Sequence, residues 1–199
     1  MHPRPGRFKQ IIRTPRLTKD GWRNKLGLRN PGLQVGMLKT NYNDVMSIAA
    51  IQPEDWLSIY GHISRQRNVE LNISCPNLDT HEDTTDFEGF NLFTNQKSDW
   101  CIVKIPPQAT NKLVDKIVNT GYTQIHASNT LPTDKGGLSG RCLQPYTLNQ
   151  IEYIKNTHPH VQVIAGGGVY AKLDAERYIN AGADHISLGT VCFTPWKIK

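Results

Sequence analysis

The stretch Leu71-Asn72-Ile73-Ser74-Cys75-Pro76-Asn77 decides the fold class of this chain. Val69, Leu71 and Ile73 alternate with other residues, as the apolar positions of a buried strand do. Polar side chains and a thiol then crowd the carboxyl end of that strand, where Pro76 stiffens the turn. The alternative interpretation is a polar strand end closed by an ordinary asparagine turn. The rest of the chain decides between the two.

Four further apolar runs end in the same way, in a lysine, in small polar residues or in glycines. They are Val103-Lys104-Ile105-Pro106-Pro107, Ile125-His126-Ala127-Ser128-Asn129-Thr130, Val163-Ile164-Ala165-Gly166-Gly167-Gly168-Val169 and Ile186-Ser187-Leu188-Gly189-Thr190. The stretches 24–32 and 136–140 indicate a tight polar loop and a glycine-rich loop. Ligand-binding residue types at the carboxyl ends of successive strands are the expected layout of a (β/α) barrel.

Predicted strands alternate with amphipathic helices from residue 45 onward. The strands are 45–51, 69–74, 101–105, 123–127, 161–165 and 185–188, and the helices are 54–67, 111–119, 147–156 and 173–181. This alternation predicts βαβ units and a parallel sheet. Segment 79–99 is acidic at first and fits neither pattern, so we expect a loop with a short helix.

Length and composition favour one soluble domain. The chain has 199 residues, of which 38% are hydrophobic and 20% are charged, enough for a real core. A complete (β/α)₈ barrel needs about 250 residues, so we predict an incomplete TIM barrel with about six of its eight strands. The sequence has no apolar run of about 18 residues, which a membrane span requires, and no apolar core of a signal peptide near its start.

The basic residues are concentrated near the start. The net charge is +6, and ten Lys or Arg lie in the first forty residues against Asp20 alone. This pattern suits nucleic-acid or anionic-membrane contact, or a solvated loop surface that attracts an anionic ligand. We favour the second interpretation, without a nucleic-acid partner, because no aromatic-interleaved RNA-binding motif accompanies the charge.

The cysteines indicate neither a metal site nor a disulfide framework. Cys75, Cys101, Cys142 and Cys192 form no C-x-x-C pair, which disfavours a zinc site. A reducing cytosol is therefore the expected compartment.

Seven motifs occur in an order that resembles the dihydroorotate dehydrogenase family of flavin (β/α)₈ barrels. They are N-K-L-G-L-R-N-P-G, N-I-S-C-P-N, V-K-I-P-P, S-N-T, G-G-L-S-G, G-G-G-V with an Asp in the following helix, and A-G-A-D-x-I-S-L-G-T-x-x-F. The resemblance covers residues 3 to 197. The cysteine of N-I-S-C-P-N is similar to the soluble class 1 enzymes, whereas G-G-L-S-G and S-N-T resemble the membrane-associated class 2, so the subclass stays open.

The resemblance implies FMN-dependent oxidation of dihydroorotate to orotate in de novo pyrimidine (UMP) synthesis. Cys75 is then the catalytic base that takes the C5 proton, and FMN accepts hydride from C6 at its N5. A thiol with an ordinary pKa of about 8.5 suits this role where its surroundings favour the thiolate. The flavin supplies the redox chemistry, and the protein supplies position and charge.

Further roles follow from the same resemblance. The residues implied to bind the orotate ring are Asn24, Asn72, Asn77, Asn129 and Thr130. Asn amides read the paired N–H and C=O groups of a pyrimidinedione. The residues implied to hold FMN are Asn72, Lys104, Gly140, Gly167, Gly168, Gly189 and Thr190. Lys104 would stabilise the anionic reduced flavin, and Gly167, Gly168, Gly189 and Thr190 would form its phosphate cup. Each residue taken alone has a structural alternative. The asparagines would cap strand ends, Lys104 would be an ordinary lysine at the barrel mouth, and the glycines would allow close backbone packing.

The chain also departs from the family pattern. It lacks the first two strands and the last helix, which indicates an internal piece or a truncated gene product made of one FMN-binding domain, residues 1–199. Two other interpretations stay open, a related flavin barrel acting on dihydropyrimidines and an inactive truncated remnant. The expected electron acceptor is fumarate, a quinone or a partner subunit. A homodimer is compatible with the resemblance, as is membrane association for a class 2-like protein.

Overall fold

The computed structural model describes residues 16–19, 21–24, 32–74, 88–134 and 136–193. Its centre is a sheet of six strands in the spatial order β10-β9-β6-β5-β4-β3. The strands are β3 (Met46–Ile48), β4 (Val69–Asn72), β5 (Cys101–Lys104), β6 (Gln124–Ala127), β9 (Gln162–Gly166) and β10 (His185–Ser187). All neighbours run parallel. The predicted parallel sheet of six strands is confirmed.

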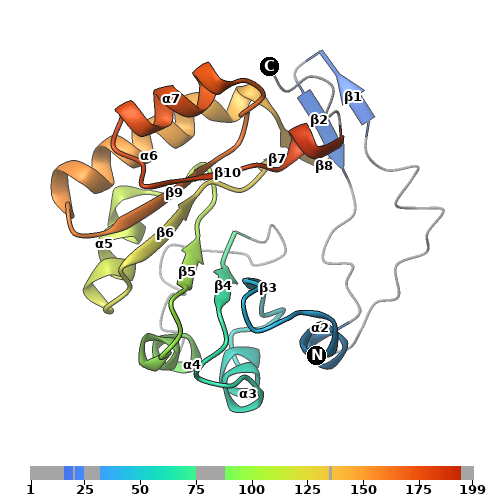
Figure 1. Cartoon of the computed structure of the whole chain (residues 1–199), viewed down its shortest axis with the longest axis vertical. Helices are drawn as coiled ribbons and strands as arrows, with labels where there is room; N and C mark the ends of the chain where they lie inside the picture. The colour runs from blue at the N-terminus through green and yellow to red at the C-terminus, as the bar shows by residue number, and fades with distance from the viewer. Residues whose placement is uncertain (1–15, 20, 25–31, 75–87, 135, 194–199) are drawn as a thin grey trace.

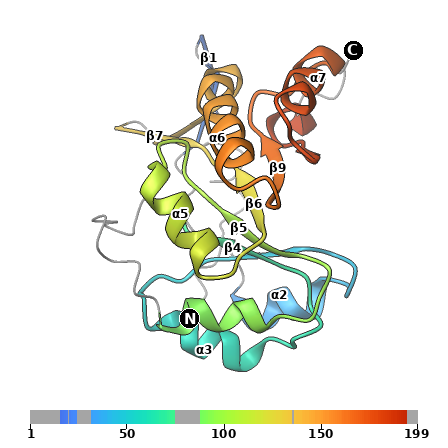
Figure 2. The same ribbon diagram turned by 90° about the vertical axis from the view of Figure 1, so that its left-hand side faces the viewer.

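The strands form an arc, and the helices follow its outer side (Figure 1). The helices are α2 (Leu33–Lys39), α3 (Asp55–His62), α4 (Glu88–Asn91), α5 (Asn111–Asn119), α6 (Gln144–Thr157) and α7 (Lys172–Asn180), with the 3₁₀ turns η1 (Leu92–Asn95), η2 (Arg141–Leu143) and η3 (Thr190–Phe193). Figure 2 looks onto the outer side, where α5 and α6 lie over the sheet. Within the described residues β3 and β10 each pair on one side only, so the arc is an open α/β barrel.

The two faces of the parallel sheet differ in chemistry. A row of apolar residues crosses the sheet in register, namely Ile48, Leu71, Val103, Ile125 and Val163. All five are buried and pack with helix residues such as Trp56 and Ile151. Burying each such side chain contributes about 1.5–3 kcal/mol to folding. Because side chains alternate along a strand, Ser47, Glu70 and Lys104 lie on the opposite, concave face.

A second sheet of four short antiparallel strands was not predicted. It contains β1 (Arg16–Thr18), β2 (Gly21–Asn24), β7 (Leu131–Thr133) and β8 (Gly136–Ser139) in the order β1-β2-β8-β7. The prediction of a glycine-rich loop at 136–140 is therefore wrong, since Gly136–Ser139 pairs on both sides as β8. A Cβ on Gly137 would lie 2.7 Å from Thr130 Oγ1, so glycine permits a close approach here. Glycine has a low strand propensity, which explains the error.

Several predicted boundaries also change. The helix predicted at 54–67 ends at His62, because Ile63 is extended, with φ −97° and ψ 131°. The helix predicted at 147–156 begins at Gln144, since η2 leads into it and Pro145 suits the first turn. The strand predicted at 45–51 is reduced to Met46–Ile48, and α2 was not predicted. The short helix expected within 79–99 is confirmed by α4 and η1, whereas 79–87 lie outside the described residues.

Candidate functional site

A cavity of about 260 Å³ lies where the carboxyl ends of the parallel strands meet the antiparallel sheet. Eight of the predicted site residues line it, namely Asn24, Lys104, Asn129, Thr130, Gly167, Gly168, Gly189 and Thr190. They come from β2, from the ends of β5, β6, β9 and β10, and from the segments that follow these strands. Residues far apart in the sequence therefore gather at the carboxyl end of the sheet, where α/β barrels bind their ligands.

Asn72 and Asn129 form a compact hydrogen-bonded group with Ser74. Asn129 Nδ2 donates to Asn72 Oδ1 at 3.4 Å and to Ser74 Oγ at 2.5 Å. Ser74 Oγ in turn donates to Asn72 Oδ1 at 2.5 Å. Asn129 lines the cavity, whereas Asn72 does not. Asn72 supports Asn129 through their hydrogen bond. The two predicted amides are thus held side by side, and a ligand with N–H and C=O groups would compete for their bonds.

Glycines after β9 make a tight turn at the cavity wall. Gly167 and Gly168 have φ values of +91° and +74°, a region that other residues seldom adopt. A Cβ on Gly168 would lie 2.8 Å from the carbonyl oxygen of Gly140. This places the predicted Gly140, which does not line the cavity, directly behind the wall. The turn leaves backbone groups, rather than side chains, facing the ligand space.

Asp174, in the first turn of α7, supports this glycine turn. Its carboxylate accepts from the backbone N–H groups of Tyr170 and Ala171, both at 3.0 Å. Gln144 Nε2 donates both to Asp174 Oδ1 and to the carbonyl oxygen of Gly168, each at 2.9 Å. Burial raises the pKa of Asp174, but these hydrogen bonds and the nearby Arg141 guanidinium outweigh it and lower the pKa overall. Asp174 is therefore a fixed anion that ties α6, α7 and the turn together.

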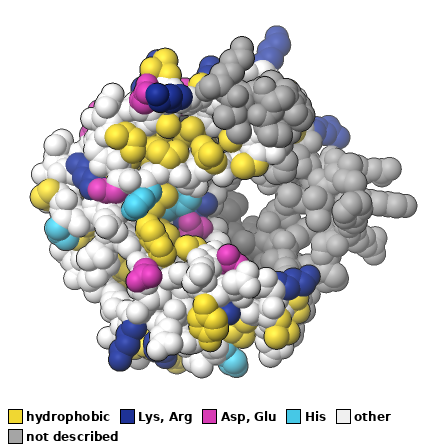
Figure 3. Space-filling model, in the orientation of Figure 1, with side chains coloured by type: hydrophobic (Ala, Val, Ile, Leu, Met, Phe, Trp, Pro, Cys, Tyr) yellow, Lys and Arg dark blue, Asp and Glu magenta, His cyan; other side chains and the backbone are white. Residues whose placement is uncertain are grey.

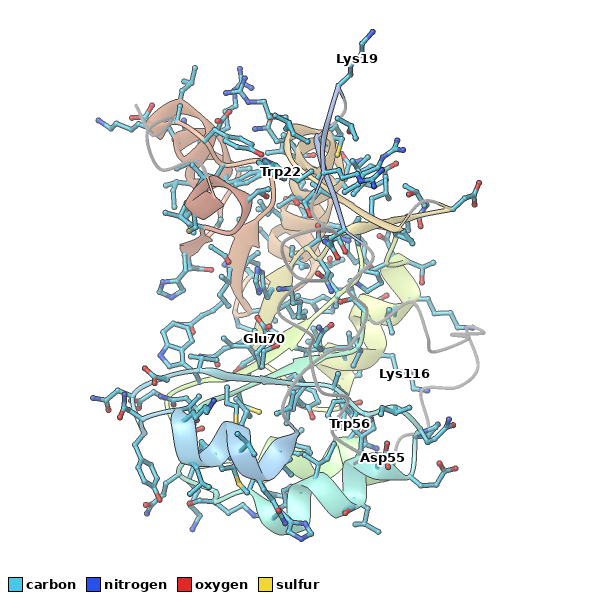
Figure 4. All side chains as sticks on the ribbon, turned by 90° about the vertical axis from the view of Figure 1, so that its right-hand side faces the viewer. Lys19, Trp22, Asp55, Trp56, Glu70 and Lys116 are labelled. Carbon is cyan, nitrogen blue, oxygen red and sulfur yellow. The ribbon has the colours of Figure 1, made fainter. Side chains whose placement is uncertain are left out.

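A buried ionic group lies on the concave face below the cavity. Glu70 Oε1 lies 3.7 Å from Lys104 Nζ, and Glu70 Oε2 lies 2.5 Å from His126 Nδ1. Ser47 Oγ also donates to Glu70 Oε1 at 2.7 Å. Figure 4 places Glu70 in the middle of the molecule, with Trp22 of β2 on one side and Trp56 of α3 on the other. Figure 3 shows acidic, basic and histidine side chains close together on this face.

Burial and charge act in opposite directions on Glu70. Burial raises its pKa, but the His126 hydrogen bond, Lys104 and Ser47 outweigh that effect and lower the pKa to about 2. Burial lowers the pKa of His126, and the Glu70 hydrogen bond only partly offsets this. At neutral pH the group therefore contains a carboxylate and a neutral imidazole beside a lysine.

Some site residues were not predicted. Nine more line the cavity, namely Trp22, Arg23, His126, Ser128, Ser139, Leu143, Gly166, Val169 and Ser187. Below them, Glu70 was also missed. The sequence does contain a signal for Glu70 and His126, because both lie inside otherwise apolar strands. Ionisable side chains are buried only with partners, so such positions indicate a paired group and a candidate site.

Two predicted residues, Cys75 and Asn77, lie outside the described residues. Cys101 is described, and its thiol donates to the carbonyl oxygen of Phe93 at 3.3 Å. Burial raises the pKa of Cys101 to about 12, so this thiol stays protonated and unreactive. Among the described residues, no three His, Cys, Asp or Glu are placed to hold a metal ion. No described helix combines the length and apolarity needed to cross a membrane.

Comparison with known proteins identifies the family. The family model for dihydroorotate dehydrogenase matches residues 2–198. The chain belongs to this family of oxidoreductases, as its motifs predicted.

Two related proteins are named dihydroorotate dehydrogenase B (NAD(+)), catalytic subunit. The one from Shouchella clausii is 29% identical to this chain over 216 residues, covering 91% of the chain and 70% of the relative. The one from Thermotoga petrophila is 28% identical, covering 97% and 79%.

Solved structures agree with the fold. The dihydroorotate dehydrogenase of Eimeria tenella in complex with ferulenol superimposes with a TM-score of 0.70 at 20% identity, over 96% of this chain and 67% of the other. The ligand-free form from the same organism gives a TM-score of 0.62, over 92% and 71%. The open arc of six parallel strands therefore corresponds to most of a dihydroorotate dehydrogenase barrel.

Proposed function

We propose that this protein oxidises dihydroorotate to orotate with FMN, as a step of de novo pyrimidine synthesis. The observation that carries the proposal is the convergence of Asn129, Lys104 and the Gly167–Gly168 turn on one cavity. An amide, a cation and a glycine turn in one space suit a pyrimidinedione beside a flavin and its phosphate. The family match adds to this chemistry.

The described residues fit FMN. The positive φ values at Gly167 and Gly168 and the lack of room for a Cβ on Gly168 make a backbone cradle, the kind of surface that phosphate uses. We propose that Gly167, Gly168, Gly189 and Thr190 hold the phosphate. Gly140 supports the cradle from behind, and Lys104 and Asn72 lie toward the ring. When bound, the flavin supplies the two-electron oxidant.

The protein's own residues would bind the substrate and move a proton. Asn24, Asn72, Asn129 and Thr130, with Asn77 from outside the described residues, are the proposed partners of the pyrimidine ring. Cys75 is the proposed base for the C5 proton. Lys104, with only 20% of its side chain exposed, would stabilise negative charge that develops during oxidation.

The electron acceptor that we favour is a partner subunit, because the relatives in S. clausii and T. petrophila are named as NAD(+)-type catalytic subunits. Fumarate and quinones are the alternatives. We further propose that residues 1–199 are one FMN-binding domain that acts in the cytoplasm and forms homodimers.

An anaerobic flavin titration tests the function. The purified protein should bind added FMN, and dihydroorotate should then bleach the visible absorbance of the flavin. Bleaching by dihydrouracil but not by dihydroorotate would favour a related dihydropyrimidine enzyme. Failure of the wild-type protein to bind FMN would overturn the proposal and indicate an inactive remnant.

A further inference from the structure

We propose that Glu70 is a positioning residue of the cavity, which holds the Lys104 ammonium in place and fixes His126 as its Nδ1–H tautomer. Glu70 is not a lining residue, whereas Lys104 and His126 both are. Any effect of Glu70 on a ligand therefore passes through these two side chains. The ligand side of this inference rests on the proposed flavin function.

The geometry gives Glu70 a partner on each neighbouring strand of the concave face. Ser47 Oγ on β3 donates to Oε1 at 2.7 Å, and the Lys104 ammonium on β5 shares that oxygen at 3.7 Å. His126 on β6 contacts the other oxygen at 2.5 Å. The Glu70 side chain is only 12% exposed, so water does not screen these contacts as it would at the surface.

The tautomer of His126 follows from which atoms of the Glu70–His126 pair can donate and which can accept a hydrogen bond. The low pKa of Glu70 keeps it a carboxylate, which only accepts hydrogen bonds. His126 Nδ1 must therefore carry the proton in the neutral ring, which leaves Nε2 as an acceptor. In free solution the Nε2–H tautomer is the more common form of neutral imidazole, so the Nδ1–H form needs Glu70. Among the described residues, Glu70 and Lys104 are the charged groups that act on this ring.

The far side of the ring is confined by β9. A Cβ on Gly166 would lie 2.8 Å from His126 Nε2, so glycine leaves the space that the ring occupies. Glu70 thus contacts Nδ1 of the ring, and the missing side chain of Gly166 leaves room for Nε2. The cavity then offers an ammonium donor from Lys104 and an acceptor from His126, which suits a ligand with a negatively polarised oxygen and an O–H or N–H group.

Nuclear magnetic resonance of the ¹⁵N-labelled chain tests both roles without any cofactor. Long-range ¹H–¹⁵N correlations, assigned with a His126→Gln variant, report the tautomer. We expect the neutral Nδ1–H form above about pH 6.5, the ordinary histidine pKa, because burial lowers the pKa of His126. The ¹⁵Nζ signal of the Lys104 ammonium, assigned with a Lys104→Gln variant, reports the ion pair between Lys104 and Glu70. Lys155, which pairs with Asp184 at 2.7 Å, is the internal control.

Two variants separate the roles. Glu70→Gln keeps an oxygen that accepts from Nδ1–H, so the tautomer should persist while the Lys104 ammonium signal is lost and that of Lys155 remains. Glu70→Leu should lose both the tautomer and the signal. A charged or Nε2–H His126 in the wild-type protein would overturn the proposal, even if the leucine variant fails to fold. So would an intact Lys104 signal in Glu70→Gln.

Adding FMN to the same samples separates this inference from the function. The Lys104 and His126 signals should shift in the wild-type protein as FMN binds. If FMN does not bind, the proposed function fails, while the tautomer and ammonium results still decide the role of Glu70. If FMN binds and neither signal shifts, the ligand side of the inference is wrong.

Discussion

At the scale of single residues, Cys75 and Cys101 have opposite expected roles. Cys75 comes after β4 in the sequence, and Cys101 is the first residue of β5. Cys75 is the proposed base, and Cys101 is a partly buried thiol whose pKa is raised to about 12 by burial. In FMN-loaded enzyme we expect Cys75→Ala to lower turnover by about 10²–10⁴-fold while FMN stays bound, because a general base contributes roughly that factor. Cys75→Ser should keep some activity that rises with pH.

Cys101→Ala is the matched control for Cys75→Ala. It removes a partly buried thiol that has no proposed proton-transfer role, and it should leave kcat near the wild-type value. Near-normal oxidation of dihydroorotate by Cys75→Ala would rule out the role of Cys75, and loss of flavin from that variant would make it a structural residue.

A second residue-scale prediction concerns the glycine turn. Gly168→Ala should destabilise the protein by about 1–3 kcal/mol, the usual cost of a residue forced into an unfavourable conformation. Its φ is +74°, and the new Cβ would lie 2.8 Å from Gly140 O and from Arg141 Cα. Urea unfolding measures the loss, and FMN titration should show weaker binding.

Gly61→Ala is the matched control, since a Cβ at Gly61 of α3 meets nothing within 4 Å. Alanine there should raise stability by about 0.5–1 kcal/mol, as expected inside a helix. Equal effects of the two substitutions would contradict the strained turn.

At the scale of elements, Arg67 fixes the C-terminal end of α2. No residue of α2 is buried, yet Arg67 is 7% exposed and donates to the carbonyl oxygens of Met37, Thr40 and Asn41, at 3.2–3.3 Å. Arg67→Met should therefore loosen the C-terminal end of α2 and the residues that follow it. Hydrogen bonds to charged groups contribute about 1.5–3 kcal/mol each, so amide exchange in α2 should quicken by at least tenfold.

Amide exchange in β4 and β5 should change little in Arg67→Met. Arg65→Met is the control, because within the described residues Arg65 donates to Tyr60 and Ile63 at the end of α3 and not to α2. If both variants open α2 alike, the Arg67 contacts are not what holds it.

Elements with a strong periodic signal could be predicted from the sequence, and those held by distant partners could not. The helix Asn111–Asn119 was predicted to the residue, since Thr110 caps it and apolar residues recur at helical spacing. The start of α6 was missed because its first turn, Gln144-Pro145-Tyr146, lies before the apolar stripe. Strand β8 was missed because its pairing with β2, over 110 residues away, does not depend on its side chains.

At the scale of the whole molecule, the site is made where two sheets meet. The pairing of β2 with β8 brings Trp22 and Asn24 close to strand ends that lie 80 or more residues later in the sequence. The sequence predicted Asn24, Lys104 and Asn129 because they match motifs of the family that the chain resembles, and Lys104 and Asn129 also end apolar runs that read as strands. It did not predict Trp22 or His126, whose roles depend on which strands become neighbours.

The last prediction concerns how the free energy of unfolding changes at acidic pH. Glu70 has a pKa of about 2 in the folded protein against 4.5 as its ordinary value. A carboxyl group with a lowered folded pKa stabilises the fold above its unfolded pKa, and this stability disappears as the pH falls through the folded pKa. The contribution is therefore fully present above about pH 4.5 and is lost toward pH 2, and its size is about 3 kcal/mol at 1.36 kcal/mol per pKa unit.

Urea unfolding of wild type and Glu70→Gln at pH 7, 4.5 and 3 measures this contribution. Glutamine does not titrate, so we expect the variant to be less stable by up to about 3 kcal/mol at pH 7, with a difference that shrinks as the pH falls. His126 also has a lowered pKa, so below about pH 6.5 the unfolded chain takes up its proton first and both proteins lose stability. Glu152→Gln, at an exposed position of α6, should follow the wild-type curve. A stability difference between wild type and Glu70→Gln that stays constant from pH 7 to 3 would mean that the Glu70 carboxylate is not held by Lys104, His126 and Ser47 in the folded protein.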